Sequence, residues 1–109
     1  YKRQIIHCAD SVPFLQNLEN TLLDTNQFID LLYLDSYDID FDNPHNSSLH
    51  HIFELLSIKK VLRPGSIVAV DDNIEHKGTW VGKGLYVAEW MQQLNKRKVY
   101  NGYQWIWEW

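Results

Sequence analysis

Two short apolar runs that each end in aspartate constrain the fold of this chain most strongly. Residues 28–34 read Phe-Ile-Asp-Leu-Leu-Tyr-Leu and are followed by Asp35, and residues 66–70 read Ser-Ile-Val-Ala-Val and are followed by Asp71 and Asp72. Short, nearly continuous apolar runs are typical of strands that are buried on both faces of a parallel sheet. The chain is therefore expected to form such a sheet, with carboxylates at the ends of its strands.

Segments with helical periodicity separate these expected strands. The spacing of the leucines predicts a helix over residues 11–23, with Ser11 as its N-cap. A second helix is expected from Asn46 or Ser47 to residue 62, before the sequence Arg-Pro-Gly. The sequence Gly-Lys-Gly at 82–84 is expected to turn into a third helix; a weak anion site at that helix N-terminus is the less favoured interpretation.

The remaining segments complete an alternation of strands and helices. A strand is expected over residues 3–9, a polar loop over 73–80, and a hairpin of strands 98–100 and 103–107 joined by Asn-Gly at 101–102. This order predicts one α/β domain over residues 1–109, with a mainly parallel sheet and a C-terminal antiparallel hairpin. The aromatic residues near the C-terminus are expected in the core or at an interface.

The composition narrows the classes of function. The 109 residues are 45% hydrophobic and 22% charged, which is ordinary for a globular domain. The formal charge of −4 argues against a nucleic-acid partner, and no apolar run is long enough to span a membrane. The single Cys8 cannot form an internal disulfide, which favours a reducing, cytoplasmic setting.

Aspartates follow each of the three expected parallel strands: Asp10, Asp35 and the pair Asp71-Asp72. In open α/β sheets the ligand site lies beyond the carboxyl ends of the strands, so these side chains are expected near one another. Carboxylate oxygens are ligands for Mg²⁺ or another divalent cation, and Asp35, Asp71 and Asp72 are the expected set. Two alternatives stay open: a basic side chain such as Lys77 or Lys83 offsets the repulsion, or the pair merely starts a solvated turn.

A second cluster consists of His50, His51 and Glu54 on the second expected helix. Glu54 lies three and four residues after the two histidines, so its carboxylate can reach either imidazole. A metal site made from this cluster alone lacks further ligands. The alternatives are that Glu54 orients one histidine toward the crevice, or that the cluster is an exposed polar face.

The motifs around the strand ends resemble those of a known family. Residues 30–36 (Asp-Leu-Leu-Tyr-Leu-Asp-Ser), 62–65 (Leu-Arg-Pro-Gly) and 66–72 (Ser-Ile-Val-Ala-Val-Asp-Asp) look like the second half of a Rossmann-like S-adenosylmethionine-dependent methyltransferase. The likeness is greatest to metal-dependent O-methyltransferases of the macrocin type. It implies a partial methyltransferase sheet with equivalents of strands three to seven, and methyl transfer to a hydroxyl of a small molecule.

The resemblance also implies roles for individual residues. Asp35, Asp71 and Asp72 would hold Mg²⁺, with Asn73 as an alternative to Asp72. The cofactor would contact residues at the ends of the third and fourth family strands, namely Ala9, Asp10, Ser11, Asp35 and Ser36. The proton of the acceptor hydroxyl would pass to one of three groups, with none preferred: Asp38, His50 or His51.

One departure from the family pattern is large. The chain opens with Tyr1-Lys2-Arg3 and has no counterpart of the first two family strands, which carry the glycine-rich loop and the ribose-binding acid. The chain is therefore expected to be a fragment that binds cofactor poorly alone and dimerises through an open sheet edge. Two other readings remain: another metal-dependent α/β enzyme with an acidic pocket, and a non-catalytic module that self-associates through Trp105 and Trp107.

Overall fold

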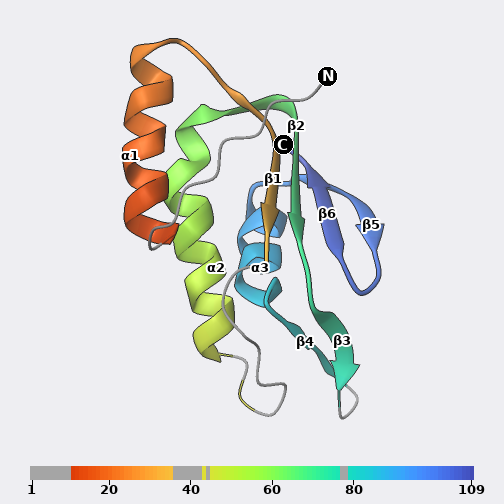
Figure 1. The fold of residues 1–109 in the computed structure, drawn as a ribbon. Coiled ribbons are helices and arrows are strands. Elements are labelled where there is room, and N and C mark those ends of the chain that lie inside the picture. The colour runs from red at the N-terminus through yellow and green to blue at the C-terminus, as the bar shows by residue number, and fades with distance from the viewer. Residues whose placement is uncertain (1–10, 36–42, 44, 77–78) are drawn as a thin grey trace, which may run out of the picture.

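The computed structural model describes residues 11–35, 43, 45–76 and 79–109. Along the chain its elements are α1 (Ser11–Asp24), β1 (Ile29–Leu34), α2 (His45–Ile58), a 3-10 turn (Lys59–Val61), β2 (Leu62–Val70), β3 (Asn73–His76), β4 (Thr79–Gly82), α3 (Leu85–Gln93), β5 (Arg97–Asn101) and β6 (Trp105–Glu108) (Figure 1). The predicted α/β class and the three predicted helices are confirmed. The strand predicted at 3–9 lies outside the described residues.

The main sheet has the strand order β1-β2-β6-β5. β1 and β2 are parallel, with α2 in the connection between them, whereas β2–β6 and β6–β5 are antiparallel. The prediction of a mainly parallel sheet is therefore wrong for the described residues. The cause is the C-terminal hairpin, because β6 pairs with β2 as well as with β5 and so contributes both antiparallel pairings.

The helices pack on one face of this sheet. Register places Leu32 beside Val68 and Val68 beside Trp107, and all three are buried in the core together with Leu55 and Ile58 of α2 and Val87 and Met91 of α3. α1 adds partly buried leucines to the same core. On the opposite face, Leu31 is 62% exposed and Tyr33 is 46% exposed. The expectation that β1 is buried on both faces is therefore wrong within the described chain.

Two turns differ from the sequence prediction. Residues 73–82, expected as a polar loop as far as residue 80, form the two-stranded hairpin β3–β4 around residues 77–78. Asn101 pairs with Trp105 within the sheet, so three residues, 102–104, connect β5 to β6 in place of a two-residue Asn-Gly turn. The longer turn places Tyr103 so that its carbonyl accepts two hydrogen bonds from Asn73, the first residue of β3.

The second helix also ends earlier than predicted. α2 stops at Ile58, a 3-10 turn follows, and β2 already begins at Leu62, so the Arg-Pro-Gly sequence lies within the strand. This early part of β2 is held at the edge of β1, because Ser66 Oγ donates to the Ile29 carbonyl at 2.6 Å and accepts from the Arg63 backbone N–H at 3.0 Å. Proline is tolerated in such an irregular strand start.

Candidate functional site

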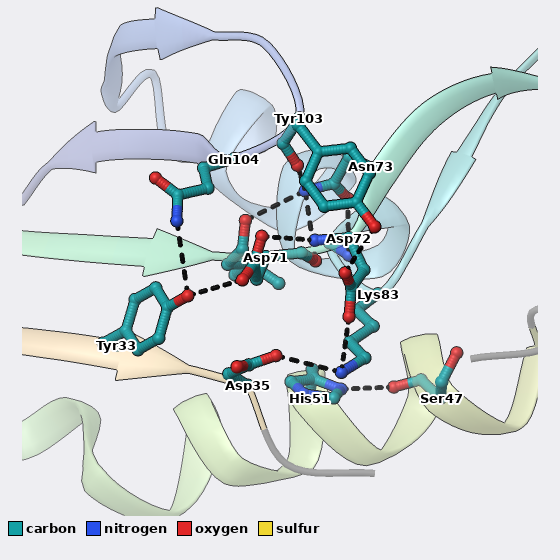
Figure 2. A network of polar contacts seen from close by, with 12 residues as sticks. Tyr33, Asp35, Ser47, His51, Asp71, Asp72, Asn73, Lys83, Tyr103 and Gln104 are labelled. Carbon is teal, nitrogen blue, oxygen red and sulfur yellow. Dashed lines mark hydrogen bonds and ion pairs between the residues drawn. The ribbon is translucent and has the colours of Figure 1, made fainter. Parts of the chain in front are cut away.

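The carboxyl ends of β1 and β2 meet at one edge of the sheet. The Asp71 backbone N–H donates to the Leu34 carbonyl at 3.3 Å, which extends the parallel pairing to the last residue of each strand. Asp35 follows β1 directly, and Asp71 and Asp72 follow β2. The three aspartates thus lie at one edge of the sheet, as the strand ends predict. Figure 2 shows that the Asp35 and Asp72 carboxylates point at Lys83, whereas the Asp71 carboxylate points toward Tyr33.

Lys83 enters this space from the turn between β4 and α3. Its Nζ lies 3.1 Å from Asp35 Oδ1 and 2.8 Å from Asp72 Oδ2. The lysine side chain is 5% exposed, whereas the Asp35 and Asp72 side chains are 45% and 23% exposed. Asp35, Asp71, Asp72 and Lys83 are called the strand-end cluster below. The ammonium thus lies beneath carboxylates that solvent and ligands can reach.

The electrostatics of the strand-end cluster favour the charged forms of Lys83 and Asp72. Burial alone would lower the pKa of Lys83, but its hydrogen bonds to Asp72 and Asp35 outweigh burial and raise that pKa. Burial alone would raise the pKa of Asp72, but hydrogen bonds from Lys83 and Tyr103 lower it. Two carboxylates, Asp35 and Asp72, contact the one ammonium, and the Asp71 carboxylate lies at the same edge of the sheet. The cluster therefore keeps an excess of negative charge that suits a cationic ligand.

Two tyrosines donate hydrogen bonds to the carboxylate pair. Tyr33 Oη donates to Asp71 Oδ2 at 2.5 Å, and Tyr103 Oη donates to Asp72 Oδ1 at 2.6 Å. Gln104 Nε2 in turn donates to Tyr33 Oη at 3.3 Å. Because the exposed face of β1 and the β5–β6 turn supply these donors, the turn of the C-terminal hairpin is part of the site.

The hydrogen bond to Asp71 raises the pKa of Tyr33 to about 12, with burial and the negative charge of Asp71 adding to the effect. We therefore expect the Tyr33 phenol to ionise well above its ordinary value of 10.0. Since the folded state holds this proton more tightly than the unfolded state, the contribution of Tyr33 to stability is complete below pH 10 and declines as the pH rises toward 12.

An alkaline absorbance titration at 295 nm checks this expectation by comparing the wild type with Tyr33→Phe. The difference between the two titration curves reports the ionisation of the Tyr33 phenol alone, and the midpoint of that difference is expected near pH 12. In the Asp71→Asn variant, the midpoint for Tyr33 is expected to fall toward pH 10. A Tyr33 midpoint at the ordinary value in the wild type would contradict the Tyr33–Asp71 contact.

Asn73 fixes the geometry of the turn that carries Lys83. The Asn73 side chain is buried, and its Nδ2 donates to the Val70 carbonyl at 2.9 Å and the Tyr103 carbonyl at 3.2 Å. Its Oδ1 accepts from the Gly84 backbone N–H at 3.0 Å. A Cβ on Gly82 would lie 2.5 Å from the Asp72 carbonyl oxygen, so glycine is needed for this close approach.

Backbone conformation completes the placement of Asp72 and Lys83. Asp72 has φ 60°, in the left-handed region, which turns its side chain away from the direction of β2. The Lys83 backbone N–H donates to the Asp72 carbonyl at 3.3 Å, and Ser48 Oγ of α2 donates to the Gly82 carbonyl at 2.7 Å. The Gly-Lys-Gly sequence is therefore the predicted turn, with its lysine aimed at carboxylates.

The histidine cluster divides into two environments. His51 is fully buried; its Nδ1 lies 2.6 Å from the Ser47 carbonyl and so donates to it, and burial lowers its pKa. His51 Nε2 has no hydrogen-bond partner among the described residues and lies 3.7 Å from Glu54 Oε1. His50 Nε2 instead lies 3.0 Å from Ser11 Oγ of α1 and 3.6 Å from Glu54 Oε2.

The two predicted proton acceptors, His50 and His51, lie in different places relative to the strand-end cluster. Figure 2 shows His51 beside Lys83, underneath the strand-end cluster. His50 turns toward α1 through its contact with Ser11, away from that cluster. Because His51 is buried, it touches no exposed ligand space in this conformation. The structure thus brings His51, but not His50, next to the carboxylates.

The structure brings some of the predicted site residues together and does not describe others. Asp35, Asp71 and Asp72 lie together, and Ser11 begins α1 beside His50. Four predicted residues lie outside the described ranges: Ala9, Asp10, Ser36 and Asp38. Sequence reasoning missed Tyr33, Tyr103 and Gln104, although the alternation of β1 places Tyr33 on the face opposite the buried leucines.

The expected metal does not fit the cluster as it stands. Within the described residues, no group of three or more His, Cys, Asp or Glu side chains is arranged to hold a metal ion. The Lys83 ammonium lies between Asp35 and Asp72, and both Asp71 oxygens already accept hydrogen bonds, from Tyr33 and from the Asp72 backbone N–H. A divalent cation would have to displace Lys83 to bind here.

Comparisons with known proteins give this chain no relative: no protein-family model, no curated protein and no solved structure matched it. Across residues 11–35, 45–76 and 79–109, none of the helices combines the length and apolar character that crossing a bilayer requires.

Proposed function

We propose that the chain forms the acceptor side of an S-adenosylmethionine-dependent methyltransferase that methylates a hydroxyl of a small molecule. The observation that carries this proposal is the meeting of Asp35, Asp71 and Asp72 at the carboxyl ends of the parallel pair β1–β2, where the Asp35 side chain is 45% exposed. Ligands of open α/β sheets bind at this edge. The sequence resemblance at the same residues supports the same class of reaction.

The arrangement suits the chemistry on the acceptor side. S-adenosylmethionine supplies an electrophilic methyl group on a positively charged sulfonium, and the excess negative charge of the strand-end cluster attracts such a ligand. The half-exposed Asp35 carboxylate accepts a hydrogen bond from the acceptor hydroxyl and orients its oxygen. Lys83 holds the Asp35 and Asp72 carboxylates at a fixed separation. The proposal uses no metal, because the cluster does not fit one.

In the proposed enzyme, Asp35 and Ser11 contribute to the cofactor side together with Ala9, Asp10 and Ser36, and Asp38 is a further proton acceptor. The proposed setting is cytoplasmic.

A transfer assay tests this function. The natural protein that contains this chain, at its full length, is incubated with methyl-labelled S-adenosylmethionine and a panel of sugars, phenols and polyketide alcohols, with EDTA and separately with Mg²⁺. We expect label in a hydroxyl product, and a loss of about a hundredfold in kcat/KM for Asp35→Asn because a positioning carboxylate is removed. Glu89→Gln, on the exposed side of α3, is the matched control and should retain activity.

Absence of label in every acceptor, with the protein folded by circular dichroism, would contradict the methyltransferase proposal. If methyl transfer were observed but Asp35→Asn were as active as the wild type, the strand-end cluster would have no role in the reaction.

A second candidate function is self-association as a homodimer. Among the described residues β1 pairs only with β2, so its other edge has no strand partner there. Apolar side chains stand exposed at this edge, including Leu31 at 62% and Phe28 at 43%. An exposed edge strand with apolar side chains is a template for pairing with another chain.

Sedimentation velocity tests the dimer. We expect the 109-residue chain to shift from monomer to dimer as its concentration rises, and Leu31→Lys to keep it monomeric because charge on an edge strand opposes pairing. Leu23→Lys is the matched control, since Leu23 is 44% exposed on α1 and distant from the edge. A wild type that stays monomeric at every concentration would exclude this candidate.

A further inference from the structure

We propose that the Lys83 ammonium is a built-in replacement for a divalent cation in the strand-end cluster, and that removing Lys83 converts the cluster into a metal site. The inference deepens the proposed function, on which it rests for the use of the cluster in methyl transfer. The cation exchange itself is a property of this chain and can be measured without any methyl donor.

The first support is the position of the ammonium. Lys83 Nζ contacts one oxygen of Asp35 and one of Asp72, at 3.1 and 2.8 Å, so it lies where a cation shared by these carboxylates would lie. The side chain is 95% removed from solvent, since it is 5% exposed. A buried ammonium with two carboxylate partners offsets the repulsion between the carboxylates, as a bound metal ion would.

The second support is that the backbone keeps Lys83 in this position. Gly82, Lys83 and Gly84 are each held by a hydrogen bond: Gly82 O accepts from Ser48, Lys83 N donates to Asp72 O, and Gly84 N donates to Asn73 Oδ1. Because the turn is anchored on both sides of the lysine, the backbone holds the start of the Lys83 side chain beside the carboxylates. A metal that competes with Lys83 must therefore displace a side chain that the fold directs into the cluster.

The third support concerns what remains when the ammonium is taken away. The oxygens of Asp35 and Asp72 that contact Nζ would lose their cation, and Asp71 follows directly on β2. The buried His51 ring lies beside Lys83 in Figure 2, with its Nε2 3.7 Å from Glu54 Oε1. Carboxylate oxygens and water are ligands that suit Mn²⁺.

The probe for the experiment is Mn²⁺, whose free aqueous ion gives an electron paramagnetic resonance signal that is lost on binding. The wild-type chain in metal-free buffer is expected to leave the signal unchanged. Lys83→Met is expected to bind one Mn²⁺ about a hundredfold more tightly than the wild type, because a repelling charge is replaced by a neutral side chain between carboxylates. Lys83→Met/Asp72→Asn is expected to lose this binding again.

Two controls distinguish the effect of removing the positive charge from other effects of replacing a lysine side chain. Lys83→Arg keeps a cation between Asp35 and Asp72 and should bind no Mn²⁺. Lys60→Met removes an exposed lysine outside the cluster and should behave as the wild type. If Lys83→Met is unfolded without metal, circular dichroism measured during the Mn²⁺ titration replaces the resonance signal, and recovery of the fold by Mn²⁺ is the expected result.

Three results would overturn the inference: Mn²⁺ binding by the wild type that Asp72→Asn abolishes, a folded Lys83→Met chain that binds no Mn²⁺, or an unfolded one that Mn²⁺ does not restore. The first of these leaves the proposed methyltransferase intact with a metal added. Conversely, an absence of methyl transfer leaves these metal measurements valid, so the two proposals fail separately.

Discussion

Asn73→Ala is expected to lower the free energy of unfolding by about 3 kcal/mol, because it removes a buried side chain whose hydrogen bonds join three parts of the fold. The Asn73 side chain connects the end of β2 at Val70, the β5–β6 turn at Tyr103 and the start of α3 at Gly84. The Gly84 N–H is buried with this contact and loses its side-chain acceptor in the variant. A desolvated donor without its acceptor contributes most of the expected loss.

Urea denaturation followed by far-ultraviolet circular dichroism measures this change. Asn20→Ala, on the exposed side of α1, is the matched control and is expected to change the free energy of unfolding by less than about 0.5 kcal/mol. An Asn73→Ala chain as stable as the control would mean that the turn carrying Lys83 does not depend on Asn73.

Lys83→Met in metal-free buffer is expected to lower the free energy of unfolding by about 3 kcal/mol at neutral pH, since breaking a largely buried ion pair leaves carboxylates without their partner. The Lys83 side chain is 5% exposed and Asp72 is 23% exposed, so solvent screens this pair only in part. The contact with the half-exposed Asp35 contributes less, because solvent screens it more strongly.

The pH dependence of this difference follows from the two pKa shifts. The pKa of Asp72 is lowered in the folded state, so its contribution is present above its ordinary value of 3.8 and disappears as the pH falls below that value. The pKa of Lys83 is raised, so its contribution is present below 10.5 and disappears as the pH rises through the folded-state pKa. The stability difference between wild type and Lys83→Met is therefore expected to be flat between these limits and smaller outside them.

Thermal or urea unfolding across this pH range checks the expectation, with Lys60→Met as the exposed-lysine control. A Lys83→Met chain that loses no more stability than Lys60→Met, or a difference that does not shrink in acid, would contradict the Asp35–Lys83–Asp72 bridge.

Much of the local structure follows from sequence patterns. The helices at residues 11–24 and 85–93, and the strand ends marked by Asp35 and Asp71, all coincide with patterns of apolar spacing and turn residues. These features depend on neighbours along the chain, so periodicity and capping are enough to predict them.

The sheet was harder to predict, because pairing depends on partners distant in sequence. The apolar runs of β1 and β2 indicate parallel strands, but nothing within them shows that β6 would pair antiparallel to β2. The Asn-Gly signal at 101–102 was overridden because the Tyr103 carbonyl bonds to Asn73, which lies thirty residues earlier. Hydrogen bonds between residues distant in the sequence can set the length of a turn, and the sequence of the turn itself does not show them.

The site could be predicted in part for the same reason. Strand ends place Asp35, Asp71 and Asp72 together, and the charge argument already required a cation among them. The sequence could not choose between a metal and a lysine, because the choice depends on a turn that Gly82, Asn73 and Ser48 fix through contacts between separate elements. Tyr33, Tyr103 and Gln104 reach the carboxylates across the sheet in the same way.

Binding of S-adenosylhomocysteine, the demethylated form of the proposed methyl donor, tests whether the ends of β1 and β2 form a methyl-donor site. S-adenosylhomocysteine is titrated into the natural full-length protein by isothermal titration calorimetry in EDTA, with Asp35→Asn as the site variant and Glu89→Gln as the control. We expect saturable one-to-one binding that Asp35→Asn weakens about tenfold or more, through loss of a carboxylate contact, and that Glu89→Gln leaves unchanged. A folded protein that shows no saturable binding, or binding that Asp35→Asn does not alter, would contradict a methyl-donor site at the ends of β1 and β2.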